Sequence, residues 1–371
     1  MRVKLKDITK FSKGTQINGK NLIDDGAYSY LNGGINPSGK WNEFSVSENT
    51  VTISEGGNSS GYVNYMNDAF WCGAHCYYLY DGPKNSKYLY YALKSQQERL
   101  FRIRSGACMP NIKKSDLGNF IIEYEKDEVR QEEVVKVLEK CELLIEDYNK
   151  KLTLLDEAVR ARFVEMFGDP VINSCQFPVQ PMTDICDIID GDRGKNYPKS
   201  EEILDDGYCL FLNAKNVTQK GFDFENCNFI TREKDDALRN GKLSRGDVVL
   251  TTRGTVGNLA YYSKNVPYEN IRINSGMVIL RMNRSILNEI YFIELFKMKL
   301  SDIKEKIASG SAQPQLPIST MNKIILMIPP LELQNQFASF VQEIDKSRSR
   351  IQKSLEASQE LFDSLMQEYF G

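Results

Sequence analysis

The amino-acid sequence predicts an α+β protein built as a tandem repeat of two similar mixed α/β domains, each followed by one long helix. Three observations support this fold class. The chain of 371 residues is too long for one typical hydrophobic core. Two stretches carry the heptad pattern of coiled-coil helices over more than three heptads. Finally, these stretches and much of the sequence before them match each other in the same order.

The long helices are expected in the middle and at the end of the chain. One stretch, 130–168, ends in VEMFG, and the other, 333–371, ends in MQEYFG, so that Gln131 corresponds to Gln334 and Gly168 to Gly371. The seam of the first helix is Val134, Leu138, Cys141, Ile145, Tyr148, Leu152, Leu155 and Val159. The matching positions of the second are Phe337, Val341, Ile344, Arg348, Ile351, Leu355, Ser358 and Phe362.

Two polar residues, Arg348 and Ser358, interrupt the second seam, and a polar seam residue often fixes helix register at some cost in stability. The alternative is two unrelated surface helices, each packed on its own domain. Shared endings and a shared seam favour the repeat.

The repeat extends into the globular halves. LIDDGAYSYLN (22–32) matches ILDDGYCLFLN (203–213), and TVTISEGGNSSGYV (50–63) matches DVVLTTRGTVGNLA (247–260). SGACMPNIKKSDLGNFII (105–122) matches SGSAQPQLPISTMNKIIL (309–326). Short apolar runs predict strands at Val51–Ile53, Val248–Thr251 and Met277–Leu280, and helices are expected near Lys87–Leu100 and Asn288–Lys306. The predicted organisation is therefore a domain over 1–126, a helix over 127–168, a domain over 169–328 and a helix over 329–371.

Composition limits the function classes. The net charge is −3, which argues against a simple basic DNA-binding protein, although a neutral domain can bind DNA through a local basic patch. The acidic excess lies in the helices: residues 126–169 hold 8 basic against 12 acidic side chains, and 331–371 hold 4 against 7. No apolar run reaches the roughly 18–20 residues of a membrane span. The start of the chain lacks the apolar segment of a signal peptide. Eight scattered cysteines are typical of reduced thiols, so a cytoplasmic protein is expected.

The order domain, helix, domain, helix resembles the specificity subunit of type I restriction–modification systems. The matching pieces are LIDDG, YLNGGINPSGKW, TISEGGNSSG, SGSAQPQLPIS, IPPLELQNQF and the two FG endings. The resemblance implies two target-recognition domains, each reading one half of a split, asymmetric duplex DNA sequence. It also implies that the two helices pair antiparallel as a spacer, which gives the repeat a pseudo-twofold relation. One departure is that EYEKDEVRQEEV, the entry to the first helix, lacks the Pro-Pro pair found at Pro329–Pro330.

The expected partners follow from the same resemblance: duplex DNA, methyltransferase subunits and, optionally, ATP-driven restriction helicase–nuclease subunits. This chain is expected to hold no cofactor, because S-adenosylmethionine, ATP and Mg²⁺ would bind the partner subunits. A helix over 130–166 would span roughly 55 Å, which exceeds a duplex turn of about 34–36 Å. Helix length is therefore expected to set the gap between the two half-sites, and a shortened helix should change that gap.

Candidate DNA-contacting residues are the polar and basic side chains of three loop types, because such groups can hydrogen-bond base edges and phosphates. The loops are the Gly-rich turns after the central strands, the Ser-Gly loops, and the segments FSKGTQINGK and DGDRGKNYPKS with nearby basic residues. In the first domain the candidates are Lys13, Gln16, Lys20, Lys40, Ser54, Asn58, Ser59, Ser60, Tyr62, Asn111 and Lys113, with Lys114 beside it. In the second they are Arg193, Lys195, Tyr197, Lys199, Lys215, Thr252, Arg253, Thr255, Asn258, Gln313 and Gln315. Each could instead be a solvated turn residue.

Catalytic motifs are not expected in this chain. GGINPSGKW has the spacing of a phosphate-binding loop, but Trp41 stands where that motif needs Ser or Thr. His75 between Cys72 and Cys76 offers too few ligands for zinc, and Cys76, next to Tyr77 and Tyr78, is expected to be buried. The sequence has no methyltransferase Gly-rich cofactor loop, no Asn/Asp-Pro-Pro-aromatic motif and no nuclease-like carboxylate cluster. No catalytic residue and no metal ligand are therefore assigned.

Two other functions stay open. The chain could be a specificity piece of a different restriction–methylation enzyme whose catalytic region lies on another polypeptide, which neighbouring genes would reveal. Alternatively, it could be a coiled-coil scaffold that binds proteins at its globular ends, in which case the assembled complex would show no sequence-selective DNA binding.

Overall fold

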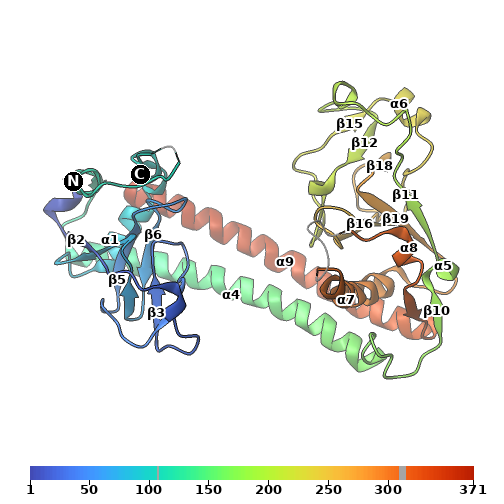
Figure 1. The fold of residues 1–371 in the computed structure, drawn as a ribbon, viewed down its shortest axis with the longest axis horizontal. Helices are drawn as coiled ribbons and strands as arrows, with labels where there is room; N and C mark the ends of the chain where they lie inside the picture. Colours follow the sequence, from blue (N-terminus) through green and yellow to red (C-terminus); the bar gives the residue numbers. More distant parts are fainter. Residues whose placement is uncertain (107, 309–314) are drawn as a thin grey trace. The chain divides into compact units, whose positions relative to one another are not determined.

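The structure, a computed structural model, describes residues 1–371 except 107 and 309–314. The chain forms two compact units, and Figure 1 shows the elements of each. Unit 1 combines Met1–Lys151 with Ile351–Gly371, and unit 2 is Leu152–Arg350. Each unit therefore contains one half of each long helix.

Unit 1 is built around an antiparallel four-stranded sheet in the order β2-β8-β5-β6, which packs against the helix α1. A three-stranded sheet, β4-β3-β7, has a parallel β3–β7 pair, and β1 pairs with β9. The strands are β1 Arg2–Lys4, β2 Lys10–Lys13, β3 Tyr28–Leu31, β4 Gly39–Trp41, β5 Thr50–Ser54, β6 Val63–Met66, β7 Phe70–Cys72, β8 Cys76–Tyr80 and β9 Ile121–Glu123. The short helices are η1 Leu5–Asp7, η2 Gly19–Asn21, α1 Ser86–Lys94, α2 Gln97–Arg102 and α3 Lys114–Gly118.

Unit 2 repeats this topology. Its four-stranded sheet is β11-β19-β16-β17, its three-stranded sheet is β15-β12-β18 with a parallel β12–β18 pair, and β10 pairs with β20. A hairpin of β13 and β14 is added. The strands are β10 Val179–Pro181, β11 Cys186–Asp190, β12 Cys209–Leu212, β13 Val217–Thr218, β14 Gly221–Phe222, β15 Phe229–Ile230, β16 Val248–Thr251, β17 Leu259–Tyr261, β18 Ile271–Ile273, β19 Met277–Met282 and β20 Ile325–Met327. The helices are α5 Met182–Ile185, η3 Ser200–Glu202, η4 Ala214–Asn216, α6 Arg232–Ala237, α7 Glu289–Ala308 and α8 Ile318–Met321.

The two long helices are α4, Glu128–Phe167, and α9, Leu331–Phe370, of 40 residues each. Every seam position in both helices is buried or half-buried, as the heptad pattern predicts. In unit 1 the beginning of α4, at Val134 and Leu138, shares a core with the end of α9, at Met366 and Phe370. In unit 2 the end of α4 shares a core with the beginning of α9. The helices therefore pack antiparallel, which confirms the expected pairing.

Arg348, which interrupts the apolar seam of α9, forms ion pairs with two aspartates. Its guanidinium contacts Asp156 of α4 at 2.5 Å and also pairs with Asp345 on its own helix. Ser358 donates its hydroxyl to the Ser354 carbonyl at 2.8 Å. Polar seam residues thus keep partners instead of leaving unpaired groups between the helices.

Both long helices have a buried glutamine at the equivalent position of their first turn. Gln131 donates to the Glu125 carbonyl at 2.6 Å, and Gln334 donates to the Pro329 carbonyl at 2.8 Å. Where α9 follows Pro-Pro, α4 has Asp127, whose side chain accepts from the amide of Val129 at 3.0 Å. A carboxylate at this position satisfies one of the free amides of the first turn, so α4 begins securely without the prolines.

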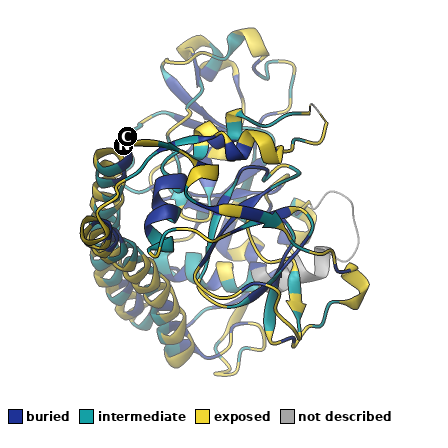
Figure 2. Cartoon of the chain, turned by 90° about the vertical axis from the view of Figure 1, so that its left-hand side faces the viewer, coloured by how far each residue is buried: buried dark blue, intermediate teal, exposed yellow. Residues whose placement is uncertain are grey.

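Both helices end in a buried phenylalanine. Phe167 lies in an aromatic cluster of unit 2, with ring centroids 4.9 Å from Phe163 and 4.8 Å from Tyr291. Phe370 lies in the core of unit 1, 5.2 Å from Tyr88. Figure 2 colours many residues of the sheets as buried, whereas exposed residues recur along the two long helices. The repeated Phe-Gly endings therefore anchor the helices in the cores.

Two sequence expectations need correction. The helix expected over Lys87–Leu100 is two helices, because the chain breaks at Ser95–Gln96; the side chain of Gln97 then bonds the amide of Val63 at 3.0 Å and the carbonyl of Gly61 at 2.7 Å. The repeat alignment also slips by one residue in the Gly-rich turn. Strand pairing matches Val63 to Leu259 rather than to Ala260, so the turn of unit 1 is one residue longer.

Candidate nucleic-acid interface

In unit 1 the Gly-rich turn and the Ser-Gly loop meet at one edge of the four-stranded sheet, and in unit 2 the Gly-rich turn meets residues 315–316 in the same way. In unit 1 the amide of Ile112 donates to the carbonyl of Glu55 at 2.9 Å, and Gly57 donates to Pro110 at 2.9 Å. In unit 2, the amide of Leu316 donates to the carbonyl of Thr252 at 3.0 Å. Two loop types that are far apart in the sequence thus form one surface in both copies.

Two further segments border this edge. In unit 1 the turn between β7 and β8 accepts from Glu55 through the carbonyl of His75 at 2.8 Å, and Gly14, just after β2, donates to Gly73 at 3.2 Å. In unit 2 the amide of Thr252 donates to Gly276 at 2.9 Å. The Arg193 side chain, beyond β11, donates to the Ser275 carbonyl at 3.3 Å. The candidate surface therefore consists of four equivalent segments in each unit.

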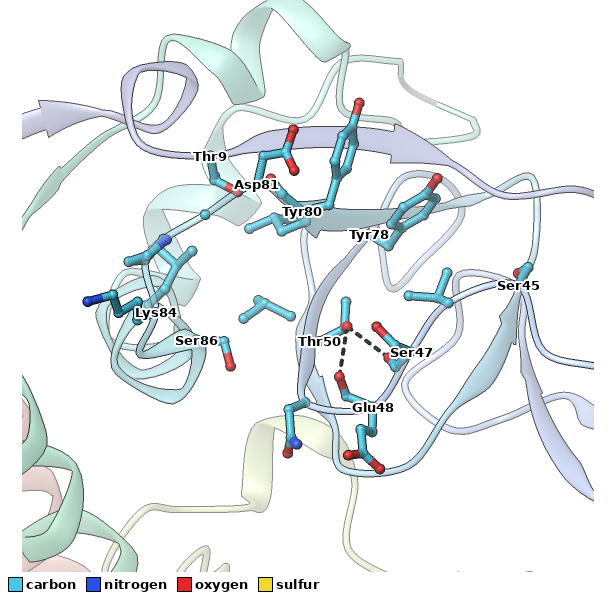
Figure 3. A pocket seen from close by; sticks show the side chains of 17 residues that line it. Thr9, Ser45, Ser47, Glu48, Thr50, Tyr78, Tyr80, Asp81, Lys84 and Ser86 are labelled. Carbon is cyan, nitrogen blue, oxygen red and sulfur yellow. Dashed lines mark hydrogen bonds between the residues drawn. The ribbon is translucent and has the colours of Figure 1, made fainter.

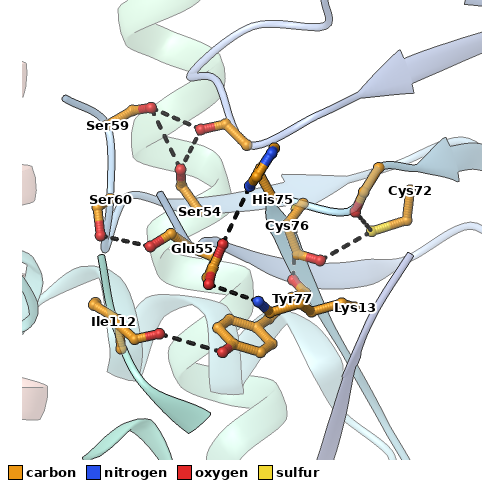
Figure 4. A network of polar contacts seen from close by, with 12 residues as sticks. Lys13, Ser54, Glu55, Ser59, Ser60, Cys72, His75, Cys76, Tyr77 and Ile112 are labelled. Carbon is orange, nitrogen blue, oxygen red and sulfur yellow. Dashed lines mark hydrogen bonds and ion pairs between the residues drawn. The ribbon is translucent and has the colours of Figure 1, made fainter. Parts of the chain in front are cut away.

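Figure 4 shows the polar network that supports this surface in unit 1. Lys13 pairs with Glu55 at 2.6 Å, and His75 contacts the other carboxylate oxygen at 3.3 Å. Ser59 donates to the Gly33 carbonyl at 2.7 Å. Below them, the hydroxyl of Tyr77 donates to the Ile112 carbonyl at 3.2 Å; burial, together with the charge of Glu55, raises the pKa of Tyr77 to about 12. The tyrosine therefore stays a neutral donor that holds the loop.

The turn of unit 2 is supported by neutral side chains. Thr251 donates to the carbonyl of Thr255 at 2.5 Å, Thr252 donates to Gly276 at 3.0 Å, and Asn258 donates to Val217 at 2.9 Å. With these groups buried, Arg253, Gly254 and Thr255 are left as consecutive exposed residues at the tip. The tip offers a cation and a hydroxyl to a ligand.

The predicted site residues differ in exposure. The exposed ones are Lys13, Gln16, Lys20, Lys40, Asn58, Asn111, Lys113, Arg193, Lys195, Lys199, Lys215, Arg253, Thr255 and Gln315. The half-buried ones are Ser59, Tyr62 and Tyr197. The buried ones are Ser54, Ser60, Thr252 and Asn258, and all four are hydrogen-bonded within the protein. Gln313 lies outside the described residues. The buried four support the turns, so the candidate interface depends on the exposed members.

Four of the exposed lysines belong to another part of the fold. Lys20 is in η2, Lys40 in β4, Lys199 directly precedes η3 and Lys215 is in η4. These elements accompany the three-stranded sheets, whereas the Gly-rich turns follow the four-stranded ones. The segment GGINPSGKW ends in the strand β4 and does not lead into a helix.

The sequence prediction omitted two features of the surface. Arg104 donates to the carbonyl of Asn58 at 3.3 Å, which joins the Ser-Gly loop to the Gly-rich turn. The turn 274–276, between β18 and β19, accepts from both Thr252 and Arg253. Its Asn-Ser-Gly sequence between two apolar runs was a usable turn signal, although the contact with the Gly-rich turn is long-range.

A separate cavity of about 500 Å³ in unit 1 lies at the opposite end of β5, beside Thr50 (Figure 3). Thr50 donates to the carbonyl of Ser47 at 2.9 Å, and Glu48 and Asp81 are among the lining residues. At the positions equivalent to Thr50 and Tyr80, unit 2 has an ion pair between Asp247 and Arg281 at 2.8 Å. The cavity is therefore separate from the candidate interface.

Cys72 and Cys76 are buried, as expected for Cys76, and His75 is engaged by Glu55. In the part of the chain that the structure describes, no group of three or more His, Cys, Asp or Glu side chains could hold a metal ion. Within the same residues, no helix is long and apolar enough to cross a bilayer.

The fold defines a duplicated protein: two copies of one mixed α/β domain present equivalent loops, and each copy contains one half of both long helices. The family of type I restriction modification DNA specificity domains matches residues 1–155 and 177–359. The chain therefore belongs to this family.

Similar proteins agree with this assignment. A Mycoplasma genitalium protein named as a type I specificity subunit is 27% identical over 377 residues, covering 96% of this chain and 90% of the relative. The specificity subunit of the MjaIX type I restriction enzyme of Methanocaldococcus jannaschii is 27% identical, covering 76% of this chain and 67% of the relative. The crystal structure of a type I S subunit from M. genitalium superimposes with a TM-score of 0.63 at 22% identity, covering 100% of this chain and 96% of that one.

Proposed function

We propose that this chain reads a split, asymmetric duplex DNA sequence, with one half-site bound by the loop surface of each unit. The observation that carries the proposal is the repeated convergence of the four loop segments. Two backbone hydrogen bonds of this surface are the same in both units, from Ile112 and Leu316 to the Gly-rich turn and from Glu55 and Thr252 to the next turn, but the exposed side chains on the surface differ. A conserved support with divergent contact groups is what two unlike half-sites require.

We further propose that the chain has no catalytic activity and delivers methyltransferase subunits, and in some assemblies restriction helicase–nuclease subunits, to the DNA. Family membership supports DNA and a methyltransferase as partners. One structurally similar chain, at a TM-score of 0.50, comes from a study of complex assembly and conformational transition in a type I system. On this proposal S-adenosylmethionine, ATP and Mg²⁺ bind the partner subunits.

The length of α4 and α9 is proposed to set the gap between the half-sites. Each helix contributes residues to both units, and α-helices lengthen by about 1.5 Å per residue. A spacer made of helices is stiff, so the gap in the DNA sequence should be fixed in base pairs.

The test is to co-express the chain with its methyltransferase in a host that lacks other DNA methylation, and to map modified bases across the genome. The expected result is a motif of two unlike specific parts around a fixed unspecified gap. The motif should vanish when this chain is deleted. Methylation with no motif, or a motif that persists without the chain, would contradict the proposal.

A further inference from the structure

The Gly-rich turn of unit 1 has a glycine at the position that faces the Ser-Gly loop. A backbone bridge joins Gly56 to Asn111. The residue before it, Glu55, accepts from the amide of Ile112 and donates its own amide to the carbonyl of His75. These three contacts define the position of the glycine within the surface.

In unit 2 the same three contacts surround an arginine. A backbone bridge joins Arg253 to Gln315. The residue before it, Thr252, accepts from the amide of Leu316 and donates its own amide to the carbonyl of Gly276. Arg253 is therefore the structural equivalent of the glycine in unit 1, and one copy of the surface carries a guanidinium that the other lacks.

The backbone that presents Arg253 is fixed. Its amide donates to the Gly276 carbonyl at 3.3 Å, and the neighbouring Thr252 is buried and hydrogen-bonded. Gly254, the next residue, has a φ of +72°, and a Cβ there would meet nothing within 4 Å. The arginine thus projects from an ordered turn beside open space. Among the described residues the Arg253 side chain forms no salt bridge. Its positive charge is therefore not neutralised by a described carboxylate.

A second guanidinium, that of Arg193, contacts the neighbouring turn 274–276. Arg193 donates to the carbonyl of Ser275 at 3.3 Å and pairs with Asp190 at 3.1 Å. Those contacts occupy one of its terminal nitrogens and partly neutralise its charge. Of the two arginines, Arg253 is the better placed to contact a ligand directly.

We propose that Arg253 reads a guanine in the half-site bound by unit 2, an inference that rests on the proposed function. The planar guanidinium can donate two parallel hydrogen bonds to N7 and O6 of guanine in the major groove. A phosphate contact would serve both half-sites alike, because the DNA backbone carries no direct sequence information. A side chain that is present in only one of two equivalent surfaces is better explained by base reading.

In unit 1, a histidine lies next to Gly56, the equivalent of Arg253. A Cβ on Gly56 would lie 3.8 Å from Nδ1 of His75, whose ring is held by Glu55. Glu55 also binds Lys13. The imidazole of His75 therefore lies beside the position from which an arginine side chain would extend. The half-site of unit 1 therefore lacks the guanine contact made by Arg253 in unit 2.

The test compares the wild-type chain with R253Q, each co-expressed in full length with its methyltransferase, by genome-wide mapping of modified bases. The matched control is K264Q, because Lys264 is also an exposed cation of unit 2 but lies between β17 and β18. Since both side chains are exposed, thermal unfolding should be unchanged in both variants. We expect one half of the motif to contain a guanine, and R253Q to relax preference at that position by about tenfold to a hundredfold. The other half, and K264Q, should be unchanged.

Two results would overturn the inference while leaving the proposed function intact. One is a split motif in which R253Q changes no base preference and lowers modification equally at all sites, as a phosphate contact predicts. The other is a relaxed position that specifies an A·T pair. A wild-type complex that modifies DNA without any motif would contradict the proposed function itself.

Discussion

Unit 1 and unit 2 have the same strand order in their main sheets but differ in how their charged side chains are paired. At the loop surface, unit 1 gathers Lys13, Glu55 and His75 into one cluster, while unit 2 supports its turn with threonines and an asparagine and leaves Arg253 exposed. Inside the three-stranded sheets the contrast reverses. Trp71 of β7 is paired with Tyr30, whereas the equivalent residue of unit 2 is the buried Arg272, paired with Phe211. The two units therefore share backbone hydrogen bonds at the loop surface, while their side chains differ both on that surface and inside the three-stranded sheets.

The helix-end anchors should give the largest effect on stability. Phe167→Ala removes a fully buried ring from the aromatic cluster of unit 2 and should cost about 4 kcal/mol, since a cavity is added to the lost transfer energy. Phe370→Ala should act in the same way on unit 1. Amide hydrogen exchange should locate each loss of protection in the core that holds the ring.

Val164→Ala is the control for these variants, because Val164 is 43% exposed on the same helix turn. It should leave protection nearly unchanged. Equal loss of protection in both units after Phe167→Ala alone would show that the two cores are not separable.

The buried charge of unit 2 should give the next largest effect. Arg272 pairs with the buried Asp235 and also donates to the carbonyls of Asn240 at 2.8 Å and Leu238 at 3.1 Å. Arg272→Met leaves these acceptors without their donor. It should cost about 3 kcal/mol, at the low end for a broken buried pair because Lys242 still reaches the carboxylate. Thermal unfolding measures the cost, and an unchanged midpoint would contradict this account.

The same carboxylate predicts a pH dependence confined to unit 2. Burial alone would raise the pKa of Asp235, but hydrogen bonds from Lys242 and Arg272 outweigh burial and hold the pKa below its usual value. A lowered folded-state pKa stabilises the fold above the unfolded value of about 4, and this stability is lost as the pH falls through the folded-state pKa. Hydrogen exchange between pH 5 and pH 3, corrected for intrinsic rates, should show unit 2 losing protection at this site. The Asp235→Asn variant should not show this component.

The smallest effect is expected at the helix seam. The pair Arg348–Asp156 is largely exposed at the carboxylate, so Asp156→Asn should cost only about 0.5 kcal/mol and less at high salt. Glu343→Gln, which breaks the surface pair with Lys346, is the matched control on α9. A loss of several kcal/mol from Asp156→Asn alone would mean that the seam depends on this charge far more than its exposure indicates.

Much of the fold could be predicted because the sequence contains two copies of it. Heptad spacing located both long helices, and the shared Phe-Gly endings gave their offset. Central strands such as β16, Val248–Thr251, were predicted with their observed bounds because they are short apolar runs before glycine turns. Side-by-side comparison of the halves supplied information that a single domain would lack.

The rest depended on contacts between distant residues. Nothing local marks the break at Ser95–Gln96, which allows Gln97 to bond Gly61 and Val63. Likewise, the sequence predicts Ser60 and Asn258 to be polar turn residues. Both are buried in the structure, in contact with segments that are distant in the sequence. Loop polarity therefore located the candidate surface but did not separate side chains that face outward from those that support the turn.

The most direct test of the central claim is to disable one loop surface at a time and map the modified bases. Asn111→Ala and Lys113→Ala together alter the exposed surface of unit 1, and Arg253→Gln with Thr255→Ala alters that of unit 2. If each unit reads its own half-site, each variant should relax only one half of the motif, and the two variants should relax opposite halves. Relaxation of the same half by both, or of both halves by either one, would contradict the account.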